Sequence, residues 1–88
     1  MSREILLSRD SAKFIEKLSD EEKNRIRDAL LQISEDPYSL PYKKIRGKKG
    51  LLRIRVGDYR ILYQVTGNEI WVVLIDRRES VYKKLKNK

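Results

Sequence analysis

The segment 51–65, LLRIRVGDYRILYQV, constrains the fold more than any other part of the chain. Apolar residues alternate with polar ones on both sides of Gly57-Asp58, and many of them are β-branched or aromatic, which is typical of β-strands. A glycine at the first position of a two-residue turn suits a type II′ hairpin. The segment therefore predicts two antiparallel strands. The predicted pairs are Val56 with Tyr59, Arg55 with Arg60, Ile54 with Ile61 and Arg53 with Leu62.

This pairing gives the hairpin one apolar face and one basic face. The apolar face carries Leu52, Ile54, Val56, Ile61, Tyr63 and Val65. The opposite face, called the arginine face below, carries Arg53, Arg55 and Arg60. Like charges directly opposite each other on neighbouring strands are destabilising, so a purely structural sheet would not favour this arrangement. One arginine alone would indicate ordinary solvated surface. Three together predict a phosphate-binding site, because the guanidinium group stays charged and binds phosphate oxygens in a bidentate way.

The N-terminal part of the chain predicts a strand followed by two helices. Residues 3–8 form a short apolar-rich segment, which we expect to lie beside the hairpin, with the sheet edge as one location. Asp10 or Ser11 can cap a short helix that ends near Leu18. A second helix begins at the capping box Ser19–Glu22 and ends by Asp36, because the next residue is proline. Its apolar stripe consists of Ile26, Ala29, Leu30 and Ile33. Both helices then pack on one face of the sheet.

A third strand follows the hairpin after the tight turn Thr66–Glu69. Residues 69–75 are apolar on both faces, which indicates a central strand. Simple alternation pairs Tyr63 with Val72, Leu62 with Val73 and Arg60 with Ile75. It then adds Ile70, Val72 and Leu74 to the apolar face, and Trp71, Val73 and Ile75 to the arginine face. The same parity places the side chain of Arg77, and not that of Arg78, on the arginine face. Trp71 is a candidate for stacking on a base, but its position across from Gln64 favours packing.

The predicted fold class is α+β, in a single domain of residues 1–88. The order is an N-terminal strand, a helical hairpin that packs on one sheet face, a three- to four-stranded antiparallel β-meander, and a short C-terminal helix or tail. An 88-residue chain has room for one small core and no separate binding domain.

Composition excludes several classes of chemistry. The chain has no cysteine and no histidine, so we expect no disulfide, no thiolate zinc site, no serine triad and no histidine-pair ribonuclease mechanism. We expect no metal and no cofactor. No apolar run approaches the length of a membrane span and no apolar stretch follows the first methionine, so we expect a cytoplasmic protein with no membrane partner.

The formal net charge of +8 is unevenly distributed. Residues 1–40 carry a net charge of −2, whereas residues 41–88 carry +10. Segment 43–50 alone holds five cations, which we expect to attract the phosphates of a polyanion at long range rather than to perform chemistry. These residues are Lys43, Lys44, Arg46, Lys48 and Lys49. Such a one-sided basic surface is typical of proteins that bind nucleic acid or an acidic partner.

Three blocks of this sequence resemble the RelE/ParE superfamily of toxins from toxin–antitoxin pairs. They are KIRG at 44–47, LRIRVGDYRILY at 52–63 and RESVY at 78–82, and with the order of elements the resemblance covers nearly the whole chain. The arginine of the last block, followed four residues later by a tyrosine, favours the RelE side. The resemblance implies the toxin of a type II toxin–antitoxin system, a metal-free, ribosome-dependent endoribonuclease that cleaves messenger RNA at the A-site codon and so inhibits translation.

The resemblance also implies which residues act. The catalytic positions would be Arg53, Arg55, Arg60, Arg78 and Tyr82. Strand parity, and not the resemblance, adds Arg77 as a further phosphate contact. The best-studied members have lysines where this chain has Arg53 and Arg55. Arginine does not lose its proton in proteins, so the general base stays open, with Tyr82 or the ribosome as alternatives to an arginine that acts only as an electrostatic clamp.

The implied partners are a cognate RelB-like antitoxin, the A site of the 30S ribosomal subunit and messenger RNA. DNA would be contacted only through the antitoxin. Two alternatives share the same fold or the same surface. One is the ParE branch, whose members inhibit DNA gyrase and cut nothing. The other is an RNA- or ribosome-binding module without chemistry.

Overall fold

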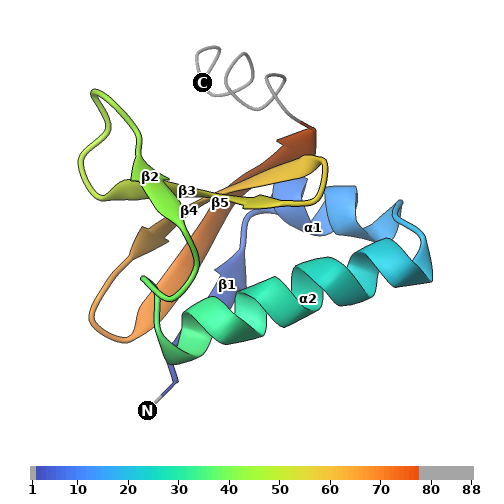
Figure 1. Ribbon diagram of the computed structural model, residues 1–88, viewed down its shortest axis with the longest axis horizontal. Helices are drawn as coiled ribbons and strands as arrows, with labels where there is room; N and C mark the ends of the chain where they lie inside the picture. The colour runs from blue at the N-terminus through green and yellow to red at the C-terminus, as the bar shows by residue number, and fades with distance from the viewer. Residues whose placement is uncertain (1, 78–88) are drawn as a thin grey trace.

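Five strands form one sheet, and two helices cover one of its faces (Figure 1). The computed structural model describes residues 2–77. The elements are β1 (Glu4–Leu7), α1 (Arg9–Glu16), α2 (Asp20–Glu35), β2 (Tyr42–Lys44), β3 (Leu51–Val56), β4 (Tyr59–Val65) and β5 (Glu69–Arg77). The order across the sheet is β1-β5-β4-β3-β2. Strand β1 is parallel to β5 and the other neighbours are antiparallel.

The predicted α+β architecture is confirmed, with β1 at an edge and β5 in the interior. The predicted C-terminal helix or tail lies outside the described residues.

The two helices begin at serines, one predicted and one not. Ser19 caps α2 in a complete capping box with Glu22. The predicted caps of α1, Asp10 and Ser11, are wrong, because Ser8 is the N-cap and its Oγ accepts a hydrogen bond from the Ser11 amide at 3.1 Å. Ser8 directly follows β1 and still has extended backbone angles, so the chain turns from strand to helix without a loop.

Strand β2 was missed because three residues are too few for an alternation signal. It pairs with β3 and makes the second edge of the sheet, with Lys43 opposite Arg53 and Lys44 opposite Leu52. The predicted basic loop is therefore shorter. It connects β2 to β3 over residues 45–50.

The β3–β4 hairpin has the predicted register. All four predicted pairs are present, including Arg55 opposite Arg60. Gly57 has a φ angle of +57°, a conformation that a residue with a Cβ rarely adopts. A turn of two residues fixes the pairing of both strands, which is why local sequence suffices here.

The β4–β5 register is correct only near its turn. Tyr63 pairs with Val72 as predicted, but Leu62 pairs with Leu74 and Arg60 with Asp76. The cause is a β-bulge at which Val73 has no direct partner in β4. Beyond the bulge every side chain of β5 changes face, so the predicted faces of Leu74 and Ile75 are wrong.

Two serine side chains at the N-terminus of α1 accommodate the backbone carbonyls at this bulge. The Ser8 Oγ donates to the Val73 carbonyl at 2.8 Å, and the buried Ser11 Oγ donates to the Val72 carbonyl at 3.3 Å. A buried carbonyl without a partner is costly, so these hydroxyls stabilise the irregular strand. The bulge and the helix N-terminus thus form one structural unit.

The core has two parts, one on each face of the sheet. The larger lies between helices and sheet and contains Ile26, Ile33, Ile54, Ile61, Tyr63, Ile70, Val72 and Ile75. The smaller lies on the opposite face and contains Leu51, Leu62 and Leu74, with Ile45 and Val73 packed against them. No helix in the described part of the chain is long and apolar enough to cross a membrane.

Candidate nucleic-acid interface

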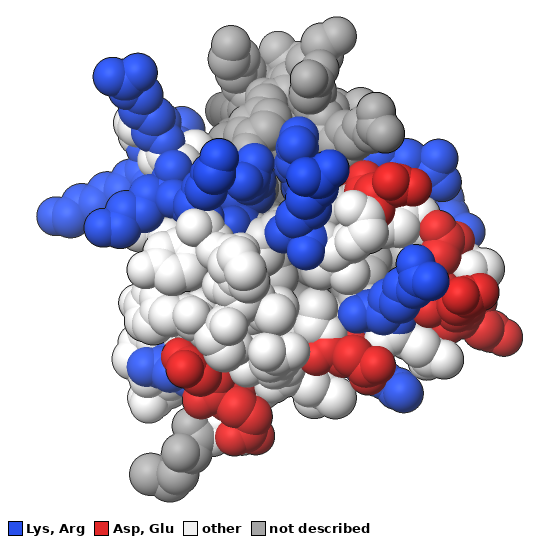
Figure 2. Space-filling model, in the orientation of Figure 1, with Lys and Arg blue, Asp and Glu red and all other residues white. Residues whose placement is uncertain are grey.

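The arginine face is formed by adjacent positions of β3 and β4. Arg55 and Arg60 are direct cross-strand partners, and Arg53 lies two residues from Arg55 on the same side of β3. Arg55 is exposed, whereas Arg53 and Arg60 are half-buried. Figure 2 shows lysine and arginine side chains gathered over the β2–β3 loop and the neighbouring strands, and acidic side chains mainly around the helices.

An apolar floor lies within the same face. Leu62, which is completely buried, pairs directly with Arg53, and Leu74 pairs with Leu62 in turn. Arginine covers apolar surface with its alkyl stem while its charged end remains accessible. The floor therefore limits how the two half-buried arginines can move, and a fixed charge stabilises an anion better than a mobile one.

Asp76 also belongs to this face, and sequence reasoning did not place it there. It pairs with Arg60 across β4 and β5, and it is only 7 % exposed. Its Oδ1 accepts a hydrogen bond from the Arg77 amide at 2.7 Å. Opposite charges in direct cross-strand register stabilise a sheet, so Asp76 offsets the repulsion between Arg60 and Arg55. The signal that could have located it is the bulge, which simple alternation does not include.

Arg77 lies on the other face, contrary to the prediction, because the bulge reverses parity. It pairs with Tyr59, donates from Nη2 to the Tyr59 hydroxyl at 3.4 Å, and its guanidinium carbon lies 5.5 Å from the Tyr59 ring centroid. The Tyr59 hydroxyl donates in turn to the Glu22 carboxylate. This hydrogen bond lowers the pKa of Glu22 and raises the pKa of Tyr59, and the contact with Tyr59 raises the pKa of Arg77. The network joins the N-terminus of α2 to the sheet, so we assign Arg77 a structural role.

The predicted phosphate contacts divide between the two faces. All five cations of segment 43–50 are exposed. By register, Lys43 extends the arginine face, because it pairs with Arg53, whereas Lys44 lies on the helix-covered face with Leu52. The other three, Arg46, Lys48 and Lys49, belong to the β2–β3 loop. The predicted basic residues therefore do not form one flat surface. They lie on both faces of the edge strand β2 and in the loop that follows it.

The described part of the site offers charge and shape, and none of its three arginines can accept a proton. Among residues 2–77 no three histidine, cysteine, aspartate or glutamate residues come together as a metal site would need. Arg78 and Tyr82, the two remaining predicted catalytic residues, lie outside the described residues. The arginine face can thus bind a phosphate and neutralise charge that develops on its oxygens.

Comparison with known proteins shows the family. The family model for the ParE toxin of type II toxin–antitoxin systems (parDE) matches residues 5–82. This chain belongs to the RelE/ParE family of type II toxins. The expected family resemblance is confirmed. A comparison with curated proteins found no match.

Solved structures of RelE proteins share the fold of this RelE/ParE toxin. A free mutant of the Escherichia coli toxin RelE has a TM-score of 0.79 at 22% identity, with 99% of this chain and 98% of that chain covered. RelE in the RelE–RelB complex of Pyrococcus horikoshii has a TM-score of 0.78 at 21% identity, covering 90% and 98%. RelE in the RelB–RelE complex of Methanococcus jannaschii has a TM-score of 0.72 at 27% identity, covering 90% and 96%. At such identities the likeness establishes the common fold.

Proposed function

We propose that this toxin is a ribosome-dependent endoribonuclease of the RelE type, which acts in the cytoplasm and cleaves messenger RNA at the A-site codon. The observation that supports the proposal most directly is the register of Arg55 opposite Arg60, with Arg53 beside them. Three guanidinium groups on one face suit a phosphate whose oxygens gain charge during the reaction.

The proposed reaction uses the substrate's own nucleophile. The ribose 2′-oxygen attacks the adjacent phosphorus, a bond forms between them, and the bond from phosphorus to the 5′-oxygen breaks. The products are a 2′,3′-cyclic phosphate and a 5′-hydroxyl. Arg55 and Arg60 hold the non-bridging oxygens, and Arg53 neutralises further charge.

The two proton transfers are assigned outside the arginine face. Arginine remains protonated in proteins, so none of the three can accept the 2′-hydroxyl proton. We assign this role to Tyr82 or to a group of the ribosome. The same group or a water molecule then gives a proton to the leaving 5′-oxygen, and Arg78 neutralises the charge that develops on that oxygen. Both assignments extend the family resemblance to residues outside the described part of the chain.

A RelB-like antitoxin is the proposed inhibitor. The solved RelE structures of Pyrococcus horikoshii and Methanococcus jannaschii contain RelE with RelB. Residues 41–88 of this chain carry a net charge of +10, which an acidic antitoxin segment would complement. The DNA contacts of such a complex would be made by the antitoxin.

Cleavage in a reconstituted translation mixture tests the proposal. Primer extension should map cuts inside the A-site codon, only when ribosomes are present. Arg60→Ala should abolish these cuts while the protein still folds, and Arg78→Ala should do the same. Arg27→Ala, which removes an exposed arginine from α2, is the control and should cut at the wild-type level. Wild-type cleavage by Arg60→Ala would refute the assignment.

Inhibition of DNA gyrase is the second candidate, because the matching family model is that of ParE toxins. A supercoiling assay with purified gyrase separates the two candidates. Loss of supercoiling without any cut messenger would replace the nuclease by the ParE activity. Messenger that is bound but never broken, with gyrase unaffected, would indicate a binding module.

A further inference from the structure

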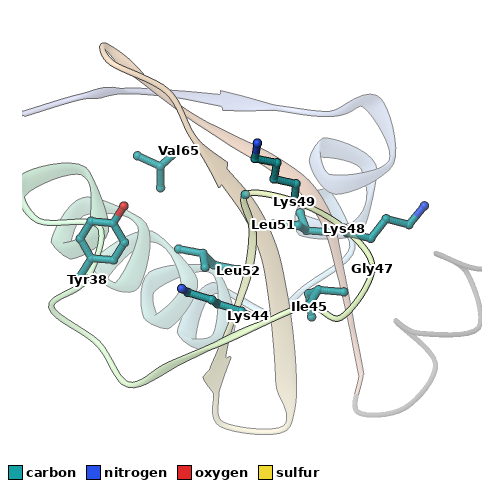
Figure 3. A pocket seen from close by; sticks show the side chains of 10 residues that line it. Tyr38, Lys44, Ile45, Gly47, Lys48, Lys49, Leu51, Leu52 and Val65 are labelled. Atoms are coloured by element: carbon teal, nitrogen blue, oxygen red, sulfur yellow. The ribbon is translucent and has the colours of Figure 1, made fainter.

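A hollow of about 600 Å³ lies between the α2–β2 connector and the β2–β3 loop (Figure 3). Its wall is apolar at Leu51, Leu52 and Val65. By register Leu52 and Val65 belong to the helix-covered side of the sheet, the side away from Arg53. Leu51 and Ile45, in contrast, belong to the smaller core on the side of Arg53. The hollow therefore lies at the end of the sheet and touches both of its sides.

Two tyrosines give this region an aromatic surface. Tyr38 in the connector and Tyr42 in β2 have ring centroids 5.4 Å apart, with the rings inclined by 57°. Tyr38 is 55 % exposed and Tyr42 is 38 % exposed, and the Tyr38 ring lines the hollow. Tyr63 is fully buried behind them, with its hydroxyl bonded to the Pro37 carbonyl. The exposed rings are thus free to stack on a further flat ring.

Three lysines and no acidic residue line the hollow together with these apolar groups. Lys48 and Lys49 come from the β2–β3 loop, and Lys44 comes from β2. Figure 3 shows the Lys44 side chain directed toward the side of the hollow on which Tyr38 lies. An anionic group held here meets positive charge without a competing carboxylate among the lining residues, which favours phosphate binding.

We propose that this hollow binds an unpaired nucleotide of single-stranded RNA, with its base stacked on Tyr38 and its phosphates held by the lysines. A ligand with charge alone would not use the aromatic rings, and an apolar peptide would not use three cations. Single-stranded nucleic acid has both properties, and proteins bind it with aromatic platforms beside basic grooves. This inference extends the proposed function, but its test requires no cleavage.

The β2 edge connects this site to the arginine face. Lys43 and Lys44 are consecutive residues of an edge strand, and by register they lie on opposite faces of the sheet. A strand of RNA that follows these two lysines around the edge would touch both surfaces. The nucleotide in the hollow would then belong to the same strand as the phosphate at Arg55.

Fluorescence anisotropy with two labelled octamers tests the site. One probe is 2′-O-methyl oligoadenylate, which lacks the 2′-hydroxyl nucleophile and cannot be cut. The other has the same backbone without bases. The wild-type protein should bind the first probe more tightly. The double variant Tyr38→Leu with Tyr42→Leu should weaken binding of oligoadenylate by about tenfold and leave the abasic probe unaffected. Tyr38→Phe keeps the ring and should behave like wild type.

Control variants distinguish the loss of base stacking from a general loss of charge and from a loss of folding. Leu31→Ala removes an exposed apolar side chain of α2 that does not line the hollow and should not change binding. Lys48→Gln with Lys49→Gln should weaken both probes, whereas Lys13→Gln with Lys17→Gln, an equal charge change in the helical part of the chain, should weaken neither. Circular dichroism of each variant confirms its fold.

Two results would overturn the proposal. One is equal affinity of the wild-type protein for both probes, and the other is wild-type affinity in the double tyrosine variant. Neither result depends on nuclease activity. Conversely, absent cleavage in the translation assay with base-dependent binding intact would refute the proposed function and leave this site standing.

Discussion

The sheet face with three arginines also carries the carboxylate of Asp76. Arg55 and Arg60 are direct partners across β3 and β4, which alone would be unfavourable. Asp76 is the partner of Arg60 on its other side, so Arg60 lies between one like and one opposite charge. The buried position of Asp76 strengthens its interaction with nearby charges, because screening by water and salt is weaker there.

We predict that Asp76→Asn destabilises the protein by about 1–2 kcal/mol, because the offsetting charge is lost. The asparagine can still accept the hydrogen bond from the Arg77 amide, so the effect isolates the charge. Urea unfolding measures it. In the Arg55→Gln background the Asp76→Asn substitution should cost about 0.5–1 kcal/mol less, because Arg60 no longer has a like charge opposite it on β3. Equal costs in both backgrounds would show that Asp76 does not act through the arginine pair.

Ionisation of Tyr63 limits the stability of the fold at alkaline pH. Its side chain is fully buried, its hydroxyl donates to the Pro37 carbonyl at 2.7 Å, and burial raises its pKa to about 12. An unfolded tyrosine has a pKa near 10. Between these two values the unfolded chain releases a proton that the folded chain keeps, so stability falls as pH rises.

We predict that the wild-type protein loses at most about 2.7 kcal/mol from this residue between pH 10 and pH 12, and that Tyr63→Phe does not show this loss. At pH 8 the Phe variant should be less stable by about 1 kcal/mol, because the Pro37 carbonyl loses its partner. Unfolding in urea at pH 8, 10 and 12 gives both numbers. A Phe variant with the same alkaline decline as wild type would assign that decline to other groups.

The elements differ in how far their own sequence determines them. The β3–β4 hairpin followed from local sequence because the Gly57-Asp58 turn sets its register. The α2 cap followed because Ser19 and Glu22 are near each other in the chain. The bulge at Val73 did not follow, because the hydroxyl that satisfies its carbonyl belongs to Ser8, sixty-five residues earlier. The predicted positions of Arg77 and Ile75 were wrong for this one reason.

The candidate site divides in the same way. The arginine face was predictable because its three arginines belong to one hairpin with a fixed register. Asp76 was not, since it reaches this face only through the bulge. Lys43 and Lys44 were predicted as one loop, but a strand of three residues assigns them to opposite faces. The sequence pattern thus predicted side-chain positions that a single tight turn determines. It missed the positions that depend on contacts between elements far apart in the chain.

We predict that Ser8→Ala is more destabilising than Ser19→Ala, although both serines are helix N-caps. Loss of Ser19 should cost about 1 kcal/mol, because its cap is exposed and water replaces it. Loss of Ser8 should cost about 2–3 kcal/mol, since it removes a cap and also leaves the Val73 carbonyl without its hydroxyl partner. Thermal unfolding of the two variants makes the comparison. Equal losses would show that the bulge does not depend on Ser8.

At the scale of the whole molecule, charge is divided unevenly between two parts of the chain. Residues 1–40 form β1 and both helices with a net charge of −2, and the remaining residues carry +10. The net charge alone does not determine where a polyanion binds. A protein that binds RNA through a defined surface should be sensitive to which cations are removed rather than to how many.

We therefore predict different salt dependence for two double variants with identical net charge. Arg55→Gln with Arg60→Gln removes two cations from the arginine face, and Arg9→Gln with Arg27→Gln removes two exposed cations from the helices. The affinity for an uncleavable single-stranded RNA should fall with salt in every protein. The slope of log affinity against log salt should be smaller by about 1.4 in the first variant, since each phosphate contact to a single strand contributes about 0.7, and unchanged in the second. Equal slopes in the two variants would mean that RNA responds to overall charge, and the arginine face would lose its role as the binding surface.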